Sequence, residues 1–215
     1  MVYWPYRKSA DQHNKEKAMP NTNTTKTALG ESLKKLVLTK RLEKITINDL
    51  TTDCGISRMA FYYHFKDIYD LVEWVCVEDG KKVLQGKKTY ETWQEGMSQI
   101  FEAVLENKVF VLNVYRSIGR EKVEGYLYKL TYEMLKEVVE DRCRGVELLA
   151  AHKDFIADFY KYGFVGIMLD WVGHGMKEDY EEIVENMGVM LHGNIARSIK
   201  NFEKADGGAT ENAAF

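Results

Sequence analysis

The stretch ITINDLTTDCGISRMAFYYHFKDIYDL, residues 45–71, decides the fold of this 215-residue chain. Thr46 can cap a helix, with Asp49 in the first turn as the acid of a capping box. Gly55 permits the left-handed backbone of a tight turn, which ends this short helix. Ser57 can then cap a second helix. The pattern predicts two short helices joined by a glycine turn, the arrangement of a helix-turn-helix whose second helix enters the DNA major groove.

The second helix, RMAFYYHF, has an outward face that water alone does not explain. At about 100° per residue, Phe61 and Phe65 fall on one side and form its core face. The opposite side carries Met59, Ala60, Tyr62, Tyr63 and His64. A face meant only for solvent would carry Glu and Lys, so this one indicates a partner.

Donors at both ends of this helix suit a nucleic-acid partner. Arg58 at its start can approach guanine or a phosphate, and Lys66 adds a positive charge where the helix ends. The free amides after Thr46 and Ser57 offer further phosphate contacts through the helix dipole. Thr46 and Ser57 would cap helices in any helical protein, so a DNA contact is an additional role.

At these residues the sequence resembles the TetR family of helical transcriptional regulators. The similarity runs from Leu29 to Leu71 and includes Gly-Ile-Ser at the turn and Tyr-Tyr-His-Phe followed by Lys. It implies a homodimer on a palindromic double-stranded DNA operator, expected to act as a repressor. With the two caps, the candidate DNA-binding residues are Thr46, Ser57, Arg58, Met59, Tyr62, Tyr63, His64 and Lys66. Ile68 replaces a lysine that is frequent in the family, which removes one expected phosphate contact.

Composition favours an all-α protein. The two prolines, Pro5 and Pro20, lie near the start, so none interrupts a helix further on. No apolar stretch reaches the roughly 20 residues of a membrane span, and the start has no apolar signal core. The three cysteines lack metal-ligand or redox spacing, which is typical of reduced thiols in a cytoplasmic protein.

Charge is divided unevenly along the chain. Residues 1–66 hold 12 Lys and Arg against 6 Asp and Glu, whereas residues 67–215 hold 18 against 27. A basic front on an acidic body is compatible with a nucleic-acid-binding module followed by a second unit.

These patterns predict four segments and about nine helices. We expect a flexible tail over 1–24, a helix-turn-helix domain over 25–72, a helical effector-binding and dimerisation domain over 73–203, and a second tail over 204–215. In the body, helices are expected at 92–107, 108–117, 120–147, 152–174 and 179–203.

The last two of these helices are candidates for a dimer-forming bundle. Glycine inside a helix costs about 1 kcal/mol relative to alanine, and close backbone approach commonly compensates for it. The candidate interface residues are Gly163, Gly166, Trp171, Met187, Leu191 and Ile195. Tight packing within one chain is the alternative.

The resemblance also implies a pocket for a small-molecule or protein effector between the central helices. Its candidate lining is aromatic: Phe110, Tyr115, Tyr126, Tyr132 and Phe159. Such a stripe also fits an ordinary helical core. The segment Gly173-His-Gly175 after Trp171 resembles a branch that includes dihydroxyacetone-kinase regulators.

No catalytic motif, metal-ligand spacing or cofactor signature accompanies these features, so we expect a regulator and not an enzyme. The alternative function is a TetR-like scaffold or co-activator whose main partner is another protein.

Overall fold

The computed structural model describes residues 22–84, 89 and 91–212, with side chains described only between residues 23 and 206. Nearly all of the expected N-terminal tail, residues 1–21, lies outside the described residues. Within them the chain forms ten α-helices and one 3-10 turn. The predicted all-α class is confirmed.

The first unit contains the motif. It is built from α1 (Thr22–Val37), the 3-10 turn η1 (Leu42–Lys44), α2 (Ile47–Cys54), α3 (Arg58–His64) and α4 (Ile68–Val83). The φ of Gly55 is 66°, in the left-handed region, which turns the chain sharply between α2 and α3. Leu29, Leu50 and Phe61 are fully buried in one core that fixes α3 against α1 and α2.

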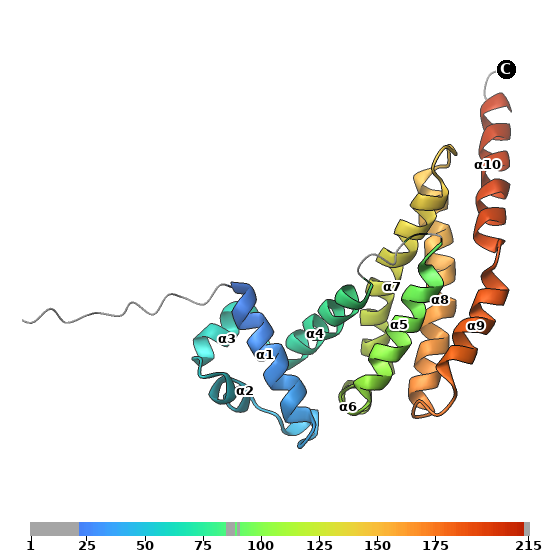
Figure 1. Ribbon diagram of the computed structural model, residues 1–215. Coiled ribbons are helices and arrows are strands. Elements are labelled where there is room, and N and C mark those ends of the chain that lie inside the picture. Colours follow the sequence, from blue (N-terminus) through green and yellow to red (C-terminus); the bar gives the residue numbers. More distant parts are fainter. Residues whose placement is uncertain (1–21, 85–88, 90, 213–215) are drawn as a thin grey trace, which may run out of the picture.

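The second unit is a bundle. It comprises α5 (Trp93–Glu106), α6 (Lys108–Ile118), α7 (Arg120–Arg142), α8 (Ala150–Gly173), α9 (Tyr180–Leu191) and α10 (Asn194–Asn212). Figure 1 shows α1 to α3 on one side of the molecule and α5 to α10 on the other, with α4 leading from one to the other. Met134, Leu135 and Leu169 are buried where α7 packs along α8.

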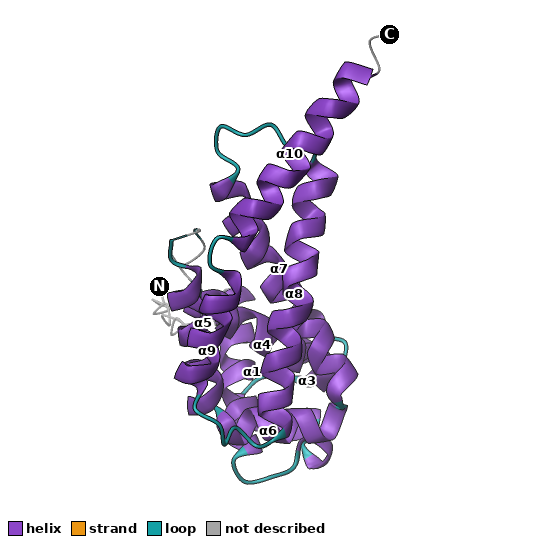
Figure 2. Cartoon of the chain, turned by 90° about the vertical axis from the view of Figure 1, so that its right-hand side faces the viewer, coloured by secondary structure: helices purple, strands orange, loops and turns teal. Residues whose placement is uncertain are grey.

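Two expected helix boundaries are wrong. The helix predicted over 120–147 ends at Arg142, before a turn. The helix predicted over 179–203 is divided in two, because Gly193 has a φ of 73° that an α-helix cannot contain. The second part, α10, continues to Asn212, through residues assigned above to a tail. Figure 2 shows this helix extending beyond the ends of α7 and α8.

One side chain of the bundle fastens the first unit to it. Asn113 of α6 accepts a hydrogen bond from the backbone N–H of Leu42 at 2.9 Å. Its amide nitrogen donates to the carbonyl oxygens of Val37 at 3.1 Å and Lys40 at 2.9 Å. The end of α1 and the start of η1 are therefore held against α6.

Candidate nucleic-acid interface

The candidate interface is the outward face of α3, and the buried face of the same helix fixes how it is presented. Phe61 is fully buried and Phe65 nearly so, and their ring centres lie 5.9 Å apart. Phe65 also packs against Trp74 of α4 at 5.8 Å. On the opposite face, 82% of Met59 and 79% of Tyr63 are exposed. The core and outward faces predicted from helical periodicity are confirmed.

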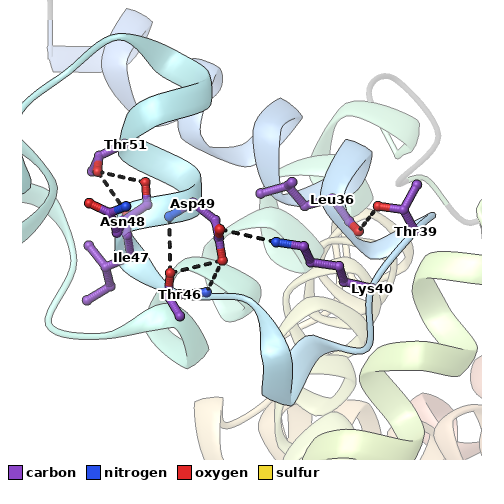
Figure 3. A network of polar contacts seen from close by, with 8 residues as sticks. All are labelled: Leu36, Thr39, Lys40, Thr46, Ile47, Asn48, Asp49 and Thr51. Carbon is purple, nitrogen blue, oxygen red and sulfur yellow. Dashed lines mark hydrogen bonds and ion pairs between the residues drawn. The ribbon is translucent and has the colours of Figure 1, made fainter.

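The caps of α2 and α3 differ in what they leave for a ligand. The Thr46 hydroxyl accepts from the backbone N–H of Asp49 at 3.1 Å and donates to its carboxylate at 2.9 Å. Figure 3 shows this carboxylate lying between Thr46 and Lys40, whose Nζ is 3.1 Å away. The Ser57 oxygen accepts from the N–H of Ala60 at 3.1 Å. Thr46 is thus committed to its cap as donor and acceptor, whereas no described residue accepts the hydrogen of the Ser57 hydroxyl.

Positive charge around α3 is of two kinds. Three lysines of this unit are neutralised by carboxylates, in the pairs Lys34–Asp79, Lys35–Asp53 and Lys40–Asp49. Arg58 and Lys66 are exposed at the two ends of α3, and neither forms an ion pair with another described residue. The Nζ of Lys26, on α1, lies 5.7 Å from the centre of the Phe65 ring. Arg58, Lys66 and Lys26 are therefore cations at α3 that no described carboxylate neutralises. Arg41 and Lys44 at η1 are exposed without an ion pair to a described residue as well.

Lys26 could not be singled out from the sequence. It precedes α3 by more than 30 positions, and only the packing of α1 across α3 brings it to the end of that helix. Nothing in the sequence around Lys26 indicates that this lysine lies beside the end of α3.

His64 supplies a hydrogen-bonding group and not a charge. Burial, with the nearby positive charge of Lys26, lowers the pKa of His64 below its ordinary value of 6.5. The imidazole is therefore neutral at neutral pH. Its ring centre lies 5.0 Å from that of Tyr63, while Tyr62 is half exposed beside Phe61. The face offers hydroxyl groups, one imidazole and a methionine side chain.

The start of α4 is occupied by its own side chains. The Asp67 carboxylate accepts from the backbone N–H of Asp70, and that of Asp70 accepts from the N–H of Lys66. Two carboxylates therefore stand where a phosphate would meet this helix, beside the half-buried Ile68.

The predicted effector-pocket residues do not stay together. Phe110 and Tyr126 line a largely apolar cavity of about 120 Å³ between α4, α5, α6, α7 and α8. Tyr132 instead donates to Asp154 at 3.0 Å on another side of α7, and 65% of Phe159 is exposed on α8. Tyr115 is half-buried on α6 and is not part of this lining. These three predicted residues therefore do not line the cavity that Phe110 and Tyr126 share, because the bundle turns them away from it.

The predicted dimer residues also divide into two groups. Gly163, Met187 and Leu191 line an open groove of about 910 Å³ between α8, α9 and α10. A Cβ on Gly166 would meet nothing within 4 Å, so this position also faces open space. Trp171 and Ile195 are 2% and 1% exposed, respectively, inside their own chain.

Placing Trp171 at an interface is wrong because its partners are intramolecular. Its ring centre lies 5.0 Å from that of Phe101 and 6.3 Å from that of Tyr180. Its indole N–H donates to the carbonyl oxygen of Glu178 at 2.9 Å. The aromatic cluster and this hydrogen bond close the turn between α8 and α9.

Known proteins that resemble this chain are transcriptional regulators. A family model described as "Transcriptional regulator C-terminal region" (TetR_C_8) matches residues 91–193, which begin just before α5 and end where Gly193 separates α9 from α10. This match covers just under half of the chain, and over it the chain is similar to the TetR family of transcriptional regulators. The helix-turn-helix seen at its front and the helical body behind it are the two parts of that fold.

Two curated HTH-type relatives match part of the chain. It is 21% identical over 97 residues to the HTH-type dhaKLM operon transcriptional activator DhaS of Lactococcus lactis subsp. lactis (strain IL1403), covering 45% of this chain and 52% of DhaS. It is 25% identical over 188 residues to the uncharacterized HTH-type transcriptional regulator YerO of Bacillus subtilis (strain 168), covering 78% of this chain and 64% of YerO. The chain thus matches about half of one relative and less than two thirds of the other.

Solved structures share the fold at low sequence identity. The dihydroxyacetone kinase operon activator DhaS superposes with a TM-score of 0.61 at 18% identity, covering 83% of this chain and 97% of that one. The TetR family repressor AlkX from Dietzia sp. strain DQ12-45-1b gives a TM-score of 0.53 at 11% identity, covering 80% and 97%. The resemblance to dihydroxyacetone-kinase regulators seen in the sequence agrees with the match to DhaS.

Two further properties concern only the described residues. They contain no helix both long and apolar enough to cross a membrane. They also contain no group of three His, Cys, Asp or Glu side chains that could hold a metal ion. The relatives are transcriptional regulators, a class of proteins that are not enzymes.

Proposed function

We propose that this TetR-like chain binds a palindromic operator as a homodimer, inserting α3 of each subunit into successive major grooves. The observation that carries the proposal is the exposed face of α3, where Met59 and Tyr63 lie between two cations without a described ion-pair partner. Short exposed helices of a helix-turn-helix read base edges in this way. Two such helices in a dimer read half-sites about 34 Å apart.

Roles within the interface follow from position. Arg58, at the start of α3, reads base edges, and Met59 and Tyr63 press on thymine methyl groups and bases. Tyr62, Ser57 and neutral His64 donate hydrogen bonds to phosphates. Lys66, beyond the helix end, contacts only the DNA backbone and no base edge. The Thr46 hydroxyl is used within its own cap. We therefore assign the phosphate contact at Thr46 to the backbone N–H groups at the start of α2 and not to that hydroxyl.

The test separates base reading from charge attraction. Duplexes selected from a random library supply the operator, and Arg58→Ala and Lys66→Ala are titrated against it and a scrambled duplex at several salt concentrations. Arg58→Ala should cost about 1–3 kcal/mol on the operator and relax preference at one or two base pairs. Lys66→Ala should weaken both duplexes alike and flatten the salt dependence.

Lys177→Ala is the matched control, because Lys177 is an exposed cation in the turn between α8 and α9. It makes the same change in net charge away from α3 and should leave both affinities unchanged. If no duplex is enriched, the proposal of sequence-specific DNA binding is wrong, and the alternative of a scaffold whose main partner is another protein is favoured. Equal losses on both duplexes with Arg58→Ala would make Arg58 a phosphate contact.

The dimer part of the proposal is supported by an uncovered face on α8. Exposed apolar side chains recur along it, with exposed fractions of 59% for Phe155, 65% for Phe159 and 55% for Tyr162. Such a stripe on a monomer surface marks an association site. The groove beside it can receive the α8 of a second copy.

Gly166→Leu tests this face directly. A Cβ at Gly166 has nothing within 4 Å in its own chain, so the substitution should spare the subunit fold and act on the partner. Gly125→Leu on α7 is the control, since that helical glycine also has open space around it. We expect sedimentation to show loss of the dimer with Gly166→Leu alone. A monomeric parent, or a dimer unaffected by Gly166→Leu, contradicts the arrangement.

The proposal includes repression and an effector. A dimer on an operator that overlaps a promoter excludes polymerase, which makes repression the expected direction. Among the similar proteins, DhaS is named an activator and AlkX a repressor. A promoter–reporter fusion with and without the gene decides the sign: lower output without it indicates activation. We place the effector in the cavity lined by Phe110 and Tyr126.

A further inference from the structure

We infer that the cavity between α4 and α8 takes a small, uncharged, mainly apolar molecule of about the size of a single benzene ring, carrying at most one hydroxyl group. The inference rests on the proposed function, since it names the class of effector for the cavity placed there. Its grounds are the size of the cavity, the chemistry of its wall and the helix that connects it to the first unit.

Size sets the upper limit. The cavity measures about 120 Å³. A buried apolar cavity of about 150 Å³ lined by Leu, Ile and Phe is known to hold benzene or xenon. A single ring therefore fits, whereas a drug-sized molecule, which needs a pocket of about 300 Å³ or more, does not.

The wall is mainly aliphatic, with Ile100, Val104, Leu130 and Met168 among its members. Contacts of this kind select shape and exclude charge, because burying an ion without a partner is costly. Apolar character is the first part of the proposed ligand class.

The polar groups of the lining offer no charge to a ligand. Asp79 is already paired with Lys34 at 2.8 Å and with Lys82 at 3.6 Å. The amide nitrogen of Asn107 donates to the carbonyl oxygen of Ala103 at 2.8 Å. A charged effector would therefore find no counter-ion that is not already engaged.

Two further groups of the wall stay neutral. Burial raises the pKa of the Cys76 thiol to about 12. Burial, followed by the negative charge of Glu73, raises the pKa of Tyr126 to about 12. The Tyr126 hydroxyl forms no hydrogen bond with another described residue, so it can make one with a hydroxyl of the ligand.

The cavity also adjoins the helix that holds the first unit. Phe110, Val111 and Val114 of α6 form part of its wall. Asn113 of the same helix makes the three hydrogen bonds to the end of α1 and the start of η1. A ligand that moves α6 therefore acts on the mounting of α3, which gives the proposed effector a route to operator affinity.

Calorimetry on the full chain without DNA tests the ligand class. The probes are phenol and benzene, with benzoate and benzylammonium as charged counterparts. We expect phenol and benzene to bind and to raise the midpoint of thermal unfolding, and the charged probes to bind at least tenfold more weakly. Tyr126→Phe should weaken phenol about fivefold, the range for one hydrogen bond, and leave benzene unchanged.

A cavity-filling pair completes the test. Ala103→Leu places a branched side chain in the cavity wall and should abolish binding of both neutral probes. Val109→Leu is the control, because Val109 is 55% exposed on α6, and it should bind as the parent does. Should Ala103→Leu fail to fold, the Tyr126→Phe comparison still decides the matter.

Failure of this inference is distinct from failure of the proposed function. If neither neutral probe binds, if a charged probe binds as tightly, or if Ala103→Leu keeps binding, the ligand class is wrong while operator binding by the parent can stand. If phenol binds but does not change operator affinity, its role as effector is overturned.

Discussion

Replacing Asn113 by alanine should loosen the attachment of the helix-turn-helix unit to the body. The change removes three hydrogen bonds to the first unit, with lengths of 2.9, 3.1 and 2.9 Å, to Leu42, Val37 and Lys40. It also removes a longer one of 3.4 Å from the Ser117 hydroxyl, which lies within α6 and does not join the two units. A hydrogen bond contributes about 0.5–1.5 kcal/mol net. Three of them give about 1.5–4.5 kcal/mol, and we expect a loss of about 3 kcal/mol in the free energy of unfolding.

Guanidinium denaturation followed by circular dichroism and tryptophan fluorescence measures this loss. Asn107→Ala is the matched control, because it is the same residue type on the flank of α6 and its side chain makes a single described hydrogen bond, to Ala103. It should cost about 1 kcal/mol. Asn113→Asp should be as harmful as Asn113→Ala, because a carboxylate would face the carbonyl oxygens of Val37 and Lys40.

Operator affinity gives an independent readout of the same attachment. Asn113→Ala leaves every side chain of α3 in place. A drop in operator affinity with unchanged helix content would therefore show that the attachment of the first unit to α6 affects DNA binding. A loss of stability below about 0.5 kcal/mol, or one no larger than that of Asn107→Ala, would refute the reasoning. Unchanged operator affinity would limit Asn113 to stability alone.

Two more predictions concern the motif. Hydrogen bonds from the backbone and hydroxyl of Thr46, then the ion pair with Lys40, hold the pKa of Asp49 below its ordinary value of 3.8. Between the two pKa values the native state keeps this carboxylate charged while the unfolded chain is protonated, so the carboxylate stabilises the native state fully above pH 3.8, and this stabilisation is lost as pH falls through the lower native pKa. Urea denaturation between pH 5 and 2 should therefore show that the free energy of unfolding falls less steeply with pH in Asp49→Asn than in the parent. Equal slopes for the two proteins would contradict this. Gly55→Ala should lower the free energy of unfolding by about 1–2 kcal/mol through the left-handed φ of 66° alone, since a Cβ at this position meets nothing within 4 Å. A loss of less than about 0.3 kcal/mol, measured by urea denaturation, would refute this.

The helix-turn-helix could be predicted from sequence because its determinants are local. A cap such as Thr46 or Ser57 bonds to a backbone group three residues away, and Gly55 acts through its own φ. The two faces of α3 follow from helical periodicity, so the burial of Phe61 and the exposure of Tyr63 could be stated in advance.

The tertiary structure decided what depends on contacts between distant segments. Trp171 and Phe159 look alike in the sequence, as aromatic residues on one helix, yet packing of α5 and α9 buries the first while the second stays 65% exposed. Lys26 reaches the end of α3 only because α1 crosses it, and Asn113 bonds to residues more than 70 positions away. Periodicity tells which side of a helix is apolar, but the elements that cover that side are chosen by the packing of the whole chain.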